Sequence, residues 1–372
     1  MSRLFFGKRM KWLKKWGNLK EKAKTSKVGI VFAVSLANIF SSEVFMKMFK
    51  LITVGALAVA ASLYAEKPVL KIAYSDWPGW TAWEIADKKG FFKKHDVNVK
   101  LEWFDYGPSM DAFAAKKVDA VGVANGDAMV LNATGAKNVT ILINDYSNGN
   151  DKIVGAPGIS SVKDLKGKKV GVEIGCLSHA LLINALLKNG LKESDVTLVN
   201  MPTHQAVQTL ESGEVSAVVA WVPHSVNALE KVTGSKELYT SANEPGIIYD
   251  VLAVSMESLM KNKAEWEKVV AAWDDVVAYI NDPKNKAEMI KILAARVGVP
   301  ESQYAKFIGG TKFLRLNESA KFFKKDDGSY GSIYGSSKRV DDFFVRNKVY
   351  DKHVDVNRYI NSSFTEKFLK AK

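Results

Sequence analysis

Hydrophobic and polar positions follow two different periods along most of the chain. Apolar runs with the length of buried strands occur at residues 68–74, 118–123, 139–144, 170–172, 196–199, 215–221 and 247–254, and residues 97–104 alternate. Between these runs, helical spacing covers residues 80–89, 108–115, 127–134, 178–189 and 203–212. After residue 258 the pattern is mainly helical, over residues 264–281, 284–296 and 301–308. Strands that alternate with helices predict an α/β fold with mostly parallel sheets flanked by helices.

Residues 1–65 differ from the rest of the chain in charge. They hold 12 of the 53 Lys and Arg residues but only 2 of the 40 acidic residues. The remainder therefore carries 41 basic and 38 acidic side chains, a net charge of +3, against +13 for the whole chain. Because the positive charge is concentrated in a leader, it does not argue for nucleic-acid binding.

Residues 46–65 have the order of regions expected of a secretory signal peptide. Met46–Lys50 is a short basic start, Leu51–Leu63 is a mostly apolar run of 13 residues, and Tyr64-Ala65 precedes a charged pair. We expect export to the periplasm and cleavage after Ala65. No cysteine lies near that position, so a lipoprotein anchor is not expected. Residues 1–45 are interpreted as an extension from a start codon assigned too early; a basic membrane-anchoring segment is the alternative.

The single cysteine, Cys176, excludes an internal disulfide framework. The 307 residues that follow position 65 must be stabilised by ordinary hydrophobic cores, and their number predicts about two domains. Cys176 is interpreted as a lone buried thiol.

The stretch Tyr74–Trp83 is the most informative part of the sequence. It places three tryptophans and one aspartate at the carboxyl end of the first predicted strand, where open α/β sheets bind their ligands. Trp is unfavourable to expose and Asp is unfavourable to bury. Asp76, Trp77 and Trp80 therefore suggest an aromatic cage around something small and positively charged. Trp83 is expected to pack in the core and anchor the following helix. The alternative to ligand contact for Trp80 is the same core role.

Four segments resemble recurring phrases of extracellular solute-binding proteins. They are residues 90–99 (Gly-Phe-Phe-Lys-Lys-His-Asp-Val-Asn-Val), 115–123, 162–172 and 210–218. The resemblance covers nearly all of residues 68–350 and is to the nitrate, sulfonate, taurine and thiamine-precursor branch of ABC-transporter binding proteins. Further segments resemble members labelled as urea- or urea-carboxylase-related, some of them associated with guanidine: residues 74–80, 102–106, 109–115, 124–128 and 143–151.

This resemblance implies a two-lobe periplasmic binding fold of type II that closes over its ligand. Residues 68–150 and 255–372 would form one lobe and residues 154–250 the other, with hinge crossings near Asn148–Lys152 and Asp250–Val254. It also implies a monomer that contacts a permease directly and works with ATPase subunits. It implies no cofactor, metal, nucleic acid or enzymatic activity.

Polar residues follow the next two predicted strands. Asn125 and Asp127 follow residues 118–123, and Asp145 and Tyr146 follow residues 139–144. All four are candidate ligand contacts. The alternatives are a helix cap for the first pair and a polar turn before a linker for the second.

Three candidates belong to the second half of the α/β region. Glu173 directly follows residues 170–172, where a carboxylate would repel nitrate or a sulfonate; a rim salt bridge is the alternative. Trp221 ends a strand and could line the cleft or pack between lobes. Asp250 could contact ligand or serve only the hinge.

These residues predict a transport receptor for a small cationic or amide-like nitrogen compound, such as guanidine or urea. A receptor for a pyrimidine thiamine precursor is one alternative. A taurine or sulfonate receptor is another, although no arginine stands at a predicted cleft position. An enzyme related to pyrimidine synthases is disfavoured, because that chemistry needs a Cys-rich motif. A structural or interaction protein would have no use for the Trp-rich loop.

His179, His204 and His224 lack metal-ligand spacing and are expected to be surface or cap residues.

Overall fold

The computed structural model describes residues 67–325 and 328–372, and the predictions for residues 1–45 and 46–65 fall outside this part. Residues 68–372 form one compact unit. Within the described ranges, no helix has both the length and the apolar character needed to cross a membrane.

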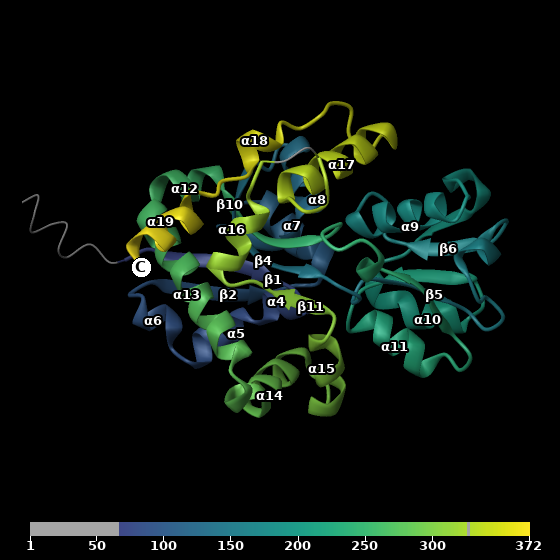
Figure 1. The fold of residues 1–372 in the computed structure, drawn as a ribbon, viewed down its shortest axis with the longest axis horizontal. Helices are drawn as coiled ribbons and strands as arrows, with labels where there is room; N and C mark the ends of the chain where they lie inside the picture. Colours follow the sequence, from purple (N-terminus) through teal and green to yellow (C-terminus); the bar gives the residue numbers. More distant parts are fainter. Residues whose placement is uncertain (1–66, 326–327) are drawn as a thin grey trace, which may run out of the picture. The chain divides into compact units, whose positions relative to one another are not determined.

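Two β-sheets organise this unit (Figure 1). The first has six strands in the order β11-β4-β10-β3-β1-β2. Their bounds are β1 (Val69–Tyr74), β2 (Asn98–Trp103), β3 (Ala120–Ala124), β4 (Asn138–Ser147), β10 (Tyr249–Ser255) and β11 (Thr311–Phe313). The second has five strands in the order β7-β6-β8-β5-β9. Their bounds are β5 (Lys152–Gly155), β6 (Lys169–Val172), β7 (Thr197–Asn200), β8 (Ala217–Ala220) and β9 (Lys236–Thr240).

Helices cover both sheets. Those that follow strands of the six-stranded sheet are α4 (Pro78–Thr81), α5 (Trp83–Lys88), α6 (Phe91–Lys94), α7 (Tyr106–Ala114), α8 (Asn125–Ala133) and α12 (Met256–Lys261). Those of the five-stranded sheet are α9 (Leu177–Lys188), α10 (Ala206–Glu211) and α11 (His224–Lys231). The C-terminal helices are α13 (Lys263–Asn281), α14 (Lys286–Val297), α15 (Glu301–Ile308), α16 (Leu316–Phe322), α17 (Ile333–Arg346), α18 (Val356–Tyr359) and α19 (Ser363–Ala371).

The α/β class and the two-lobe periplasmic binding fold predicted from the sequence are confirmed, but the sheets are mixed rather than mostly parallel. Five of the nine strand pairs in the described residues are antiparallel. Four of these pairs involve β10, which pairs with β3 and β4, or β5, which pairs with β8 and β9; the fifth joins β11 to β4. Strands β4 and β5 are joined by one chain crossing between the sheets, and β9 and β10 by the other.

The chain crosses between the sheets twice. The first crossing joins β4 to β5 through residues 148–151, and the second joins β9 to β10 through residues 241–248. The second crossing therefore comes before the predicted Asp250–Val254, because those residues already pair with β3. The hydroxyl groups of Ser147 and Ser241 hydrogen-bond each other at 2.7 Å and so connect the two crossings.

Apolar side chains explain why the first βα unit folds as it does. Four of the six residues of β1 are buried, as its apolar sequence requires. Trp83 is fully buried, and its ring centroid lies 4.7 Å from that of Trp273 in α13 and 5.9 Å from that of Phe92. This packing fixes the start of α5, and with it the preceding loop that carries Asp76 and Trp77.

Candidate functional site

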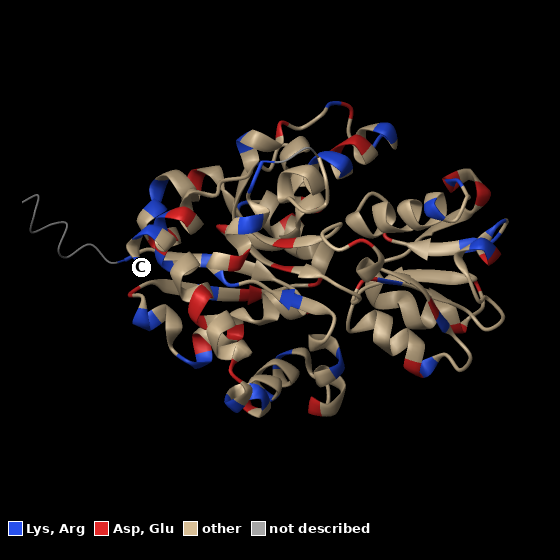
Figure 2. Cartoon of the chain, in the orientation of Figure 1, with Lys and Arg blue, Asp and Glu red and all other residues tan. Residues whose placement is uncertain are grey.

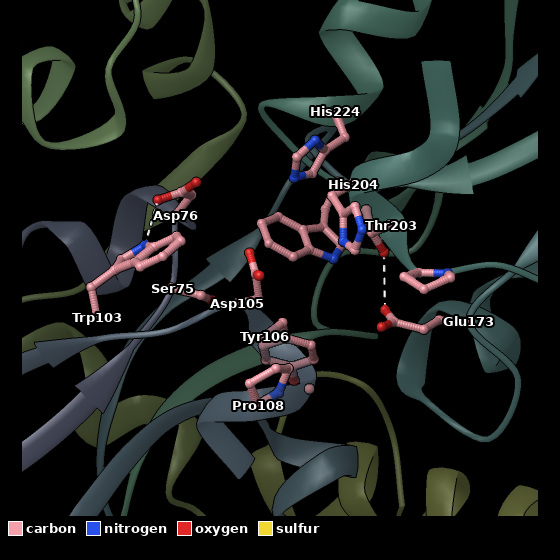
Figure 3. A pocket seen from close by; sticks show the side chains of 13 residues that line it. Ser75, Asp76, Trp103, Asp105, Tyr106, Pro108, Glu173, Thr203, His204 and His224 are labelled. Atoms are coloured by element: carbon pink, nitrogen blue, oxygen red, sulfur yellow. Dashed lines mark hydrogen bonds between the residues drawn. The ribbon is translucent and has the colours of Figure 1, made fainter. Parts of the chain in front are cut away.

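Two adjoining cavities lie where strand ends of the two sheets meet. The larger, here called the outer chamber, has a volume of about 320 Å³. It is lined by Ser75, Asp76, Trp103, Asp105, Tyr106, Gly107, Pro108, Glu173, Pro202, Thr203, His204, Trp221 and His224 (Figure 3). The smaller, here called the inner cavity, has a volume of about 20 Å³. It is lined by Trp77, Trp80, Tyr106, Ala124, Asp127, Asp151, Leu177, Ser178, Trp221, Ile248 and Asp250.

Aromatic rings form one wall of the inner cavity. Trp80 stacks on Tyr106, with ring centroids 5.3 Å apart and planes 6° from parallel. Trp77 lies 6.3 Å from Trp80 and 6.5 Å from Trp221. Gly122, in β3, leaves space for the Trp80 ring. A Cβ atom at position 122 would lie only 2.8 Å from Cγ of Trp80. The Nε1 of Trp80 is buried without a hydrogen-bond partner among the described residues.

Asp127 joins the two lobes directly. The hydroxyl of Tyr106 donates a hydrogen bond of 2.6 Å to its Oδ2, and the backbone N–H of Leu177 donates one of 3.1 Å to its Oδ1. Leu177 is the first residue of α9, so the carboxylate occupies the positive end of this helix. Burial nevertheless raises the pKa of Asp127 to about 7.

Asp145 and Asp250 form a buried carboxyl pair. They are register partners of β4 and β10 and are 0% and 2% exposed. Trp77 Nε1 donates a hydrogen bond of 3.0 Å to Asp145 Oδ1. Burial raises the pKa of Asp145 to about 7, and burial followed by the charges of Asp145 and Asp151 raises that of Asp250 well above its ordinary value. Two carboxyls placed in this way cannot both ionise readily unless a cation joins them.

Asp151 adds a third acid to the inner cavity, beside Asp127 and Asp250. It lies in the first crossing, and burial raises its pKa to about 6. Lys152, which lowers this pKa, is itself ion-paired with Glu237 at 2.6 Å. Figure 2 shows acidic segments on strands and loops between the two sheets.

The inner cavity is therefore rich in acceptors and poor in donors. Asp127, Asp151 and Asp250 line the cavity, and no Lys or Arg does. The Oδ2 atoms of Asp151 and Asp250 are buried without an N–H donor among the described residues, and Asp250 shares a hydrogen bond only with another acid, Asp145. Buried carboxylates without a cation are unfavourable. A small cation with several N–H groups would supply the missing donors and charge, and the tryptophan faces would favour it further.

The outer chamber is also acidic, with Asp76, Asp105 and Glu173 among its lining residues. Trp103 Nε1 donates a hydrogen bond of 2.7 Å to Asp76, and Thr203 Oγ1 donates one of 2.9 Å to Glu173 on the opposite side (Figure 3). Burial raises the pKa of both carboxyls. Burial and the nearby His204 lower the pKa of His224 to about 4, so this imidazole is neutral at pH 7.

Seven of the ten site residues predicted from the sequence line these cavities. Trp77, Trp80, Asp127 and Asp250 line the inner cavity, Asp76 and Glu173 line the outer chamber, and Trp221 lines both.

The other three predicted residues, Asn125, Asp145 and Tyr146, line neither cavity. The Asn125 side chain donates to Ser336 and Ser337 and accepts from the backbone N–H of Tyr249, so its polar groups are already paired.

Asp145 and Tyr146 are displaced because β4 continues to Ser147 instead of ending at Asn144. Asp145 packs over Gly79, where a Cβ would lie 1.6 Å from its Oδ2. The Tyr146 ring packs against Phe322, with centroids 5.8 Å apart. Asp145 therefore contacts the inner cavity through two of its wall residues, Trp77 and Asp250, with which it shares hydrogen bonds. Tyr146 packs against the hydrophobic core.

Sequence reasoning missed several lining residues. The sequence places Asp151 in the predicted crossing near Asn148–Lys152 but does not mark it as a ligand contact. Tyr106 has no signal of its own, since its role arises from stacking on Trp80. His204 and His224 were expected at the surface or at caps, yet they line the outer chamber.

One group among the described residues has the spacing of a metal site, and it lies outside both cavities. Asp341, Asp342 and His353 offer ligand atoms within 4.8 Å of one another. Asp341 already accepts hydrogen bonds from the Tyr350 hydroxyl at 2.7 Å and the Val354 N–H at 2.9 Å. These bonds give Asp341 a structural role.

Cys176 is a free, partly buried thiol. Burial and the nearby Asp127 raise its pKa.

Several bacterial proteins are similar to this chain in sequence. A protein of Brucella abortus (strain 2308) named as a binding protein is 32% identical over 182 residues, which cover 48% of this chain and 56% of that protein. The chain therefore matches little more than half of that relative's length. A protein of Escherichia coli (strain K12) named as an aliphatic sulfonates-binding protein is 25% identical over 317 residues, covering 83% of this chain and 93% of that protein.

The fold is also similar to a solved structure, the periplasmic aliphatic sulphonate binding protein SsuA from Escherichia coli. The TM-score is 0.67 at 22% sequence identity, and the match covers 81% of this chain and 100% of that chain. At this identity the likeness establishes the fold. The model of the NMT1-like family matches residues 64–294, and the chain belongs to that family.

Proposed function

We propose that this protein is the periplasmic substrate-binding component of an ABC importer. Its family, its periplasmic binding fold and its cavities between two sheets joined by two crossings support this role. In this proposal the protein works as a monomer, closes over a small molecule, and delivers it by direct contact with a permease that works with ATPase subunits. Ligand would stabilise the closed form through contacts that only that form offers.

We further propose that the ligand carries a small planar cationic group of the guanidinium type. The observation that carries this proposal is the set of enclosed carboxyl oxygens beside the Trp80 and Trp221 rings, in a cavity lined by no Lys or Arg. Guanidinium can donate in pairs to carboxylates and can stack on Trp. Urea has a similar shape without the charge, so we expect it to bind more weakly.

The inner cavity must widen to admit such a group. Its volume of about 20 Å³ is room for little more than one water-sized group. A hydrogen bond of 3.1 Å from the backbone N–H of Leu177 in one lobe to Asp127 Oδ1 in the other holds the inner cavity closed. In this proposal the lobes part at that contact and close again around the ligand.

A sulfonate such as taurine is the second candidate, and the name of the Escherichia coli relative favours it. A helix N-terminus is the natural place for such an anion. Here the carboxylate of Asp127 already occupies the N-terminus of α9, and Glu173 lies in the adjoining chamber. Both charges would repel a sulfonate, and we therefore rank this candidate second.

Calorimetric titration of the purified protein with guanidinium chloride, urea, taurine and an aminopyrimidine thiamine precursor tests the proposal. We expect guanidinium to bind with micromolar or tighter affinity and urea to bind at least about tenfold more weakly. Tight binding of taurine together with no binding of guanidinium would contradict it. Asp250→Asn is the informative variant, and Asp274→Asn is a matched buried control outside both cavities.

A further inference from the structure

The outer chamber has no function in the binding of an ion as small as guanidinium. It is more than ten times larger than the inner cavity, with volumes of about 320 Å³ and 20 Å³. The two share the side chains of Tyr106 and Trp221 as walls. A ligand whose head fills the inner cavity would therefore leave the adjoining chamber free for a second chemical group.

The walls of the outer chamber define the charge of that second group. Asp76, Asp105 and Glu173 line it, and no Lys or Arg does. Arg296 stacks on the Trp103 ring, 5.1 Å from its centroid, and partly offsets the charge of Asp76. Asp105 precedes α7, makes no capping hydrogen bond there, and is drawn between the other two carboxylates in Figure 3. The field in the chamber thus favours a cation or an N–H donor and disfavours a carboxylate.

The shared walls define the connection between the two groups. The Tyr106 and Trp221 rings meet edge to face, with centroids 5.9 Å apart and planes 72° from parallel. An alkyl chain needs about 3.5–4.0 Å to carbon atoms on each side, so it cannot pass while these rings touch. Tyr106 begins α7 and Trp221 follows β8, so the rings come from different lobes and separate when the lobes part. On closure they would clamp a short aliphatic chain.

We propose that the natural ligand is a two-part cation, an aminoalkyl guanidine or a close analogue. Its planar head occupies the inner cavity, a short aliphatic chain passes between Tyr106 and Trp221, and an amine end lies among the carboxylates of the outer chamber. This inference rests on the proposed function, because it requires the inner cavity to hold the cationic head.

Four compounds with the same head test the proposal by calorimetric titration of the purified protein. They are guanidinium, butylguanidine, agmatine with its terminal amine, and 4-guanidinobutyrate with its terminal carboxylate. We expect agmatine to bind about tenfold more tightly than butylguanidine and about a hundredfold more tightly than 4-guanidinobutyrate. Butylguanidine should bind at least as tightly as guanidinium.

Two variants connect this order to the outer chamber. Glu173→Gln keeps an acceptor for Thr203 while it removes the charge, and Asp105→Asn removes the second charge. Each should lower the ratio of agmatine affinity to butylguanidine affinity toward one. Matched controls on the exposed surface are Glu214→Gln, in the same lobe as Glu173, and Asp111→Asn, on α7. Both controls should keep the wild-type ratio.

The outcomes separate the two proposals. If guanidinium binds most tightly of the four, or if 4-guanidinobutyrate binds as tightly as agmatine, the two-part ligand is contradicted while the proposed function stands. If no guanidine compound binds and taurine does, the proposed cationic ligand fails and this inference fails with it, while the role as a substrate-binding component stands.

Discussion

Asp250 and Asp274 are two aspartates with nearly the same burial and opposite electrostatics. They are 2% and 3% exposed. Burial would raise the pKa of Asp274, but hydrogen bonds from Arg315 and Lys372 outweigh it and hold that pKa below its ordinary value. For Asp250, burial and the neighbouring Asp145 and Asp151 all act in the same direction and raise its pKa. The chain therefore supplies cations for one buried carboxyl and leaves the other without them.

The difference separates a structural acid from one that is open to a ligand. Asp274 accepts from Arg315 Nε at 3.2 Å, Lys372 Nζ at 2.9 Å and the Leu316 N–H at 3.1 Å, so it fixes the C-terminal segment onto α13. Asp250 lines the inner cavity, its Oδ2 has no N–H donor among the described residues, and the side chain that shares a hydrogen bond with it is another acid, Asp145. A buried acid in this condition destabilises the unliganded protein and gains most from an external cation.

Exchange of each aspartate for asparagine should have opposite consequences. Asp250→Asn should weaken guanidinium binding about a hundredfold, because a buried charged contact is lost. Asp274→Asn should leave that affinity unchanged and lower the free energy of unfolding by about 1–2 kcal/mol, since its partners are partly exposed. Calorimetric titration and urea unfolding measure the two effects. Equal guanidinium affinities for the two variants would remove the distinction between the two aspartates.

The aromatic wall should matter less than the acids. Trp221→Leu should weaken guanidinium binding about tenfold, because it removes a desolvated cation–π contact but no hydrogen bond. Titration of the variant measures this, and its thermal unfolding confirms that it is folded. An affinity within about twofold of the wild type would mean that the cation does not lie over this ring.

Guanidinium affinity should rise with pH. Asp127, Asp145 and Asp151 have pKa values raised by burial to about 7, 7 and 6, so protons compete with a cation below that range. From about pH 5.5 to about pH 8 the affinity should increase roughly tenfold. Because binding releases protons, the measured enthalpy should depend on the ionisation enthalpy of the buffer. The Asp274→Asn variant should keep this slope and Asp250→Asn should reduce it. A fall in affinity over this range would point to an anionic ligand.

The same titrations should also change the stability of the unliganded protein. The raised pKa values mean that the folded state binds more protons than the unfolded state between the ordinary Asp pKa of about 4 and the folded values of about 6 to 7. The free energy of unfolding should therefore fall by at least about 2 kcal/mol as the pH rises from about 5 to about 7.5. Urea unfolding across this range is the measurement. Asp250→Asn should flatten the dependence, and a rise with pH in the wild type would contradict the account.

The sequence identified the strand ends well because apolar runs are a local signal. Asp76, Trp77 and Glu173 directly follow such runs, and the structure places all three at the cavities. Asp145 and Tyr146 show the limit of this reasoning. Polar residues that follow an apolar run can still belong to the strand, and here β4 continues through both of them.

Other features depend on contacts between distant segments. Tyr106 lines both cavities because it stacks on Trp80, and Asp127 meets α9 across the two lobes. Most of the antiparallel pairs involve strands next to the crossings, whose direction no local pattern encodes. The paired cations of Asp274 likewise come from residues 41 and 98 positions away. No sequence pattern could therefore separate this structural acid from Asp250.

A crystal structure of the protein grown with guanidinium chloride shows whether the inner cavity is the cation site. We expect one guanidinium in a widened inner cavity, with its N–H groups within about 3 Å of carboxyl oxygens of Asp250 and Asp151 and its plane against an indole ring. An inner cavity that stays closed while guanidinium lies elsewhere, or an anion bound at the N-terminus of α9 in place of Asp127, would contradict this expectation.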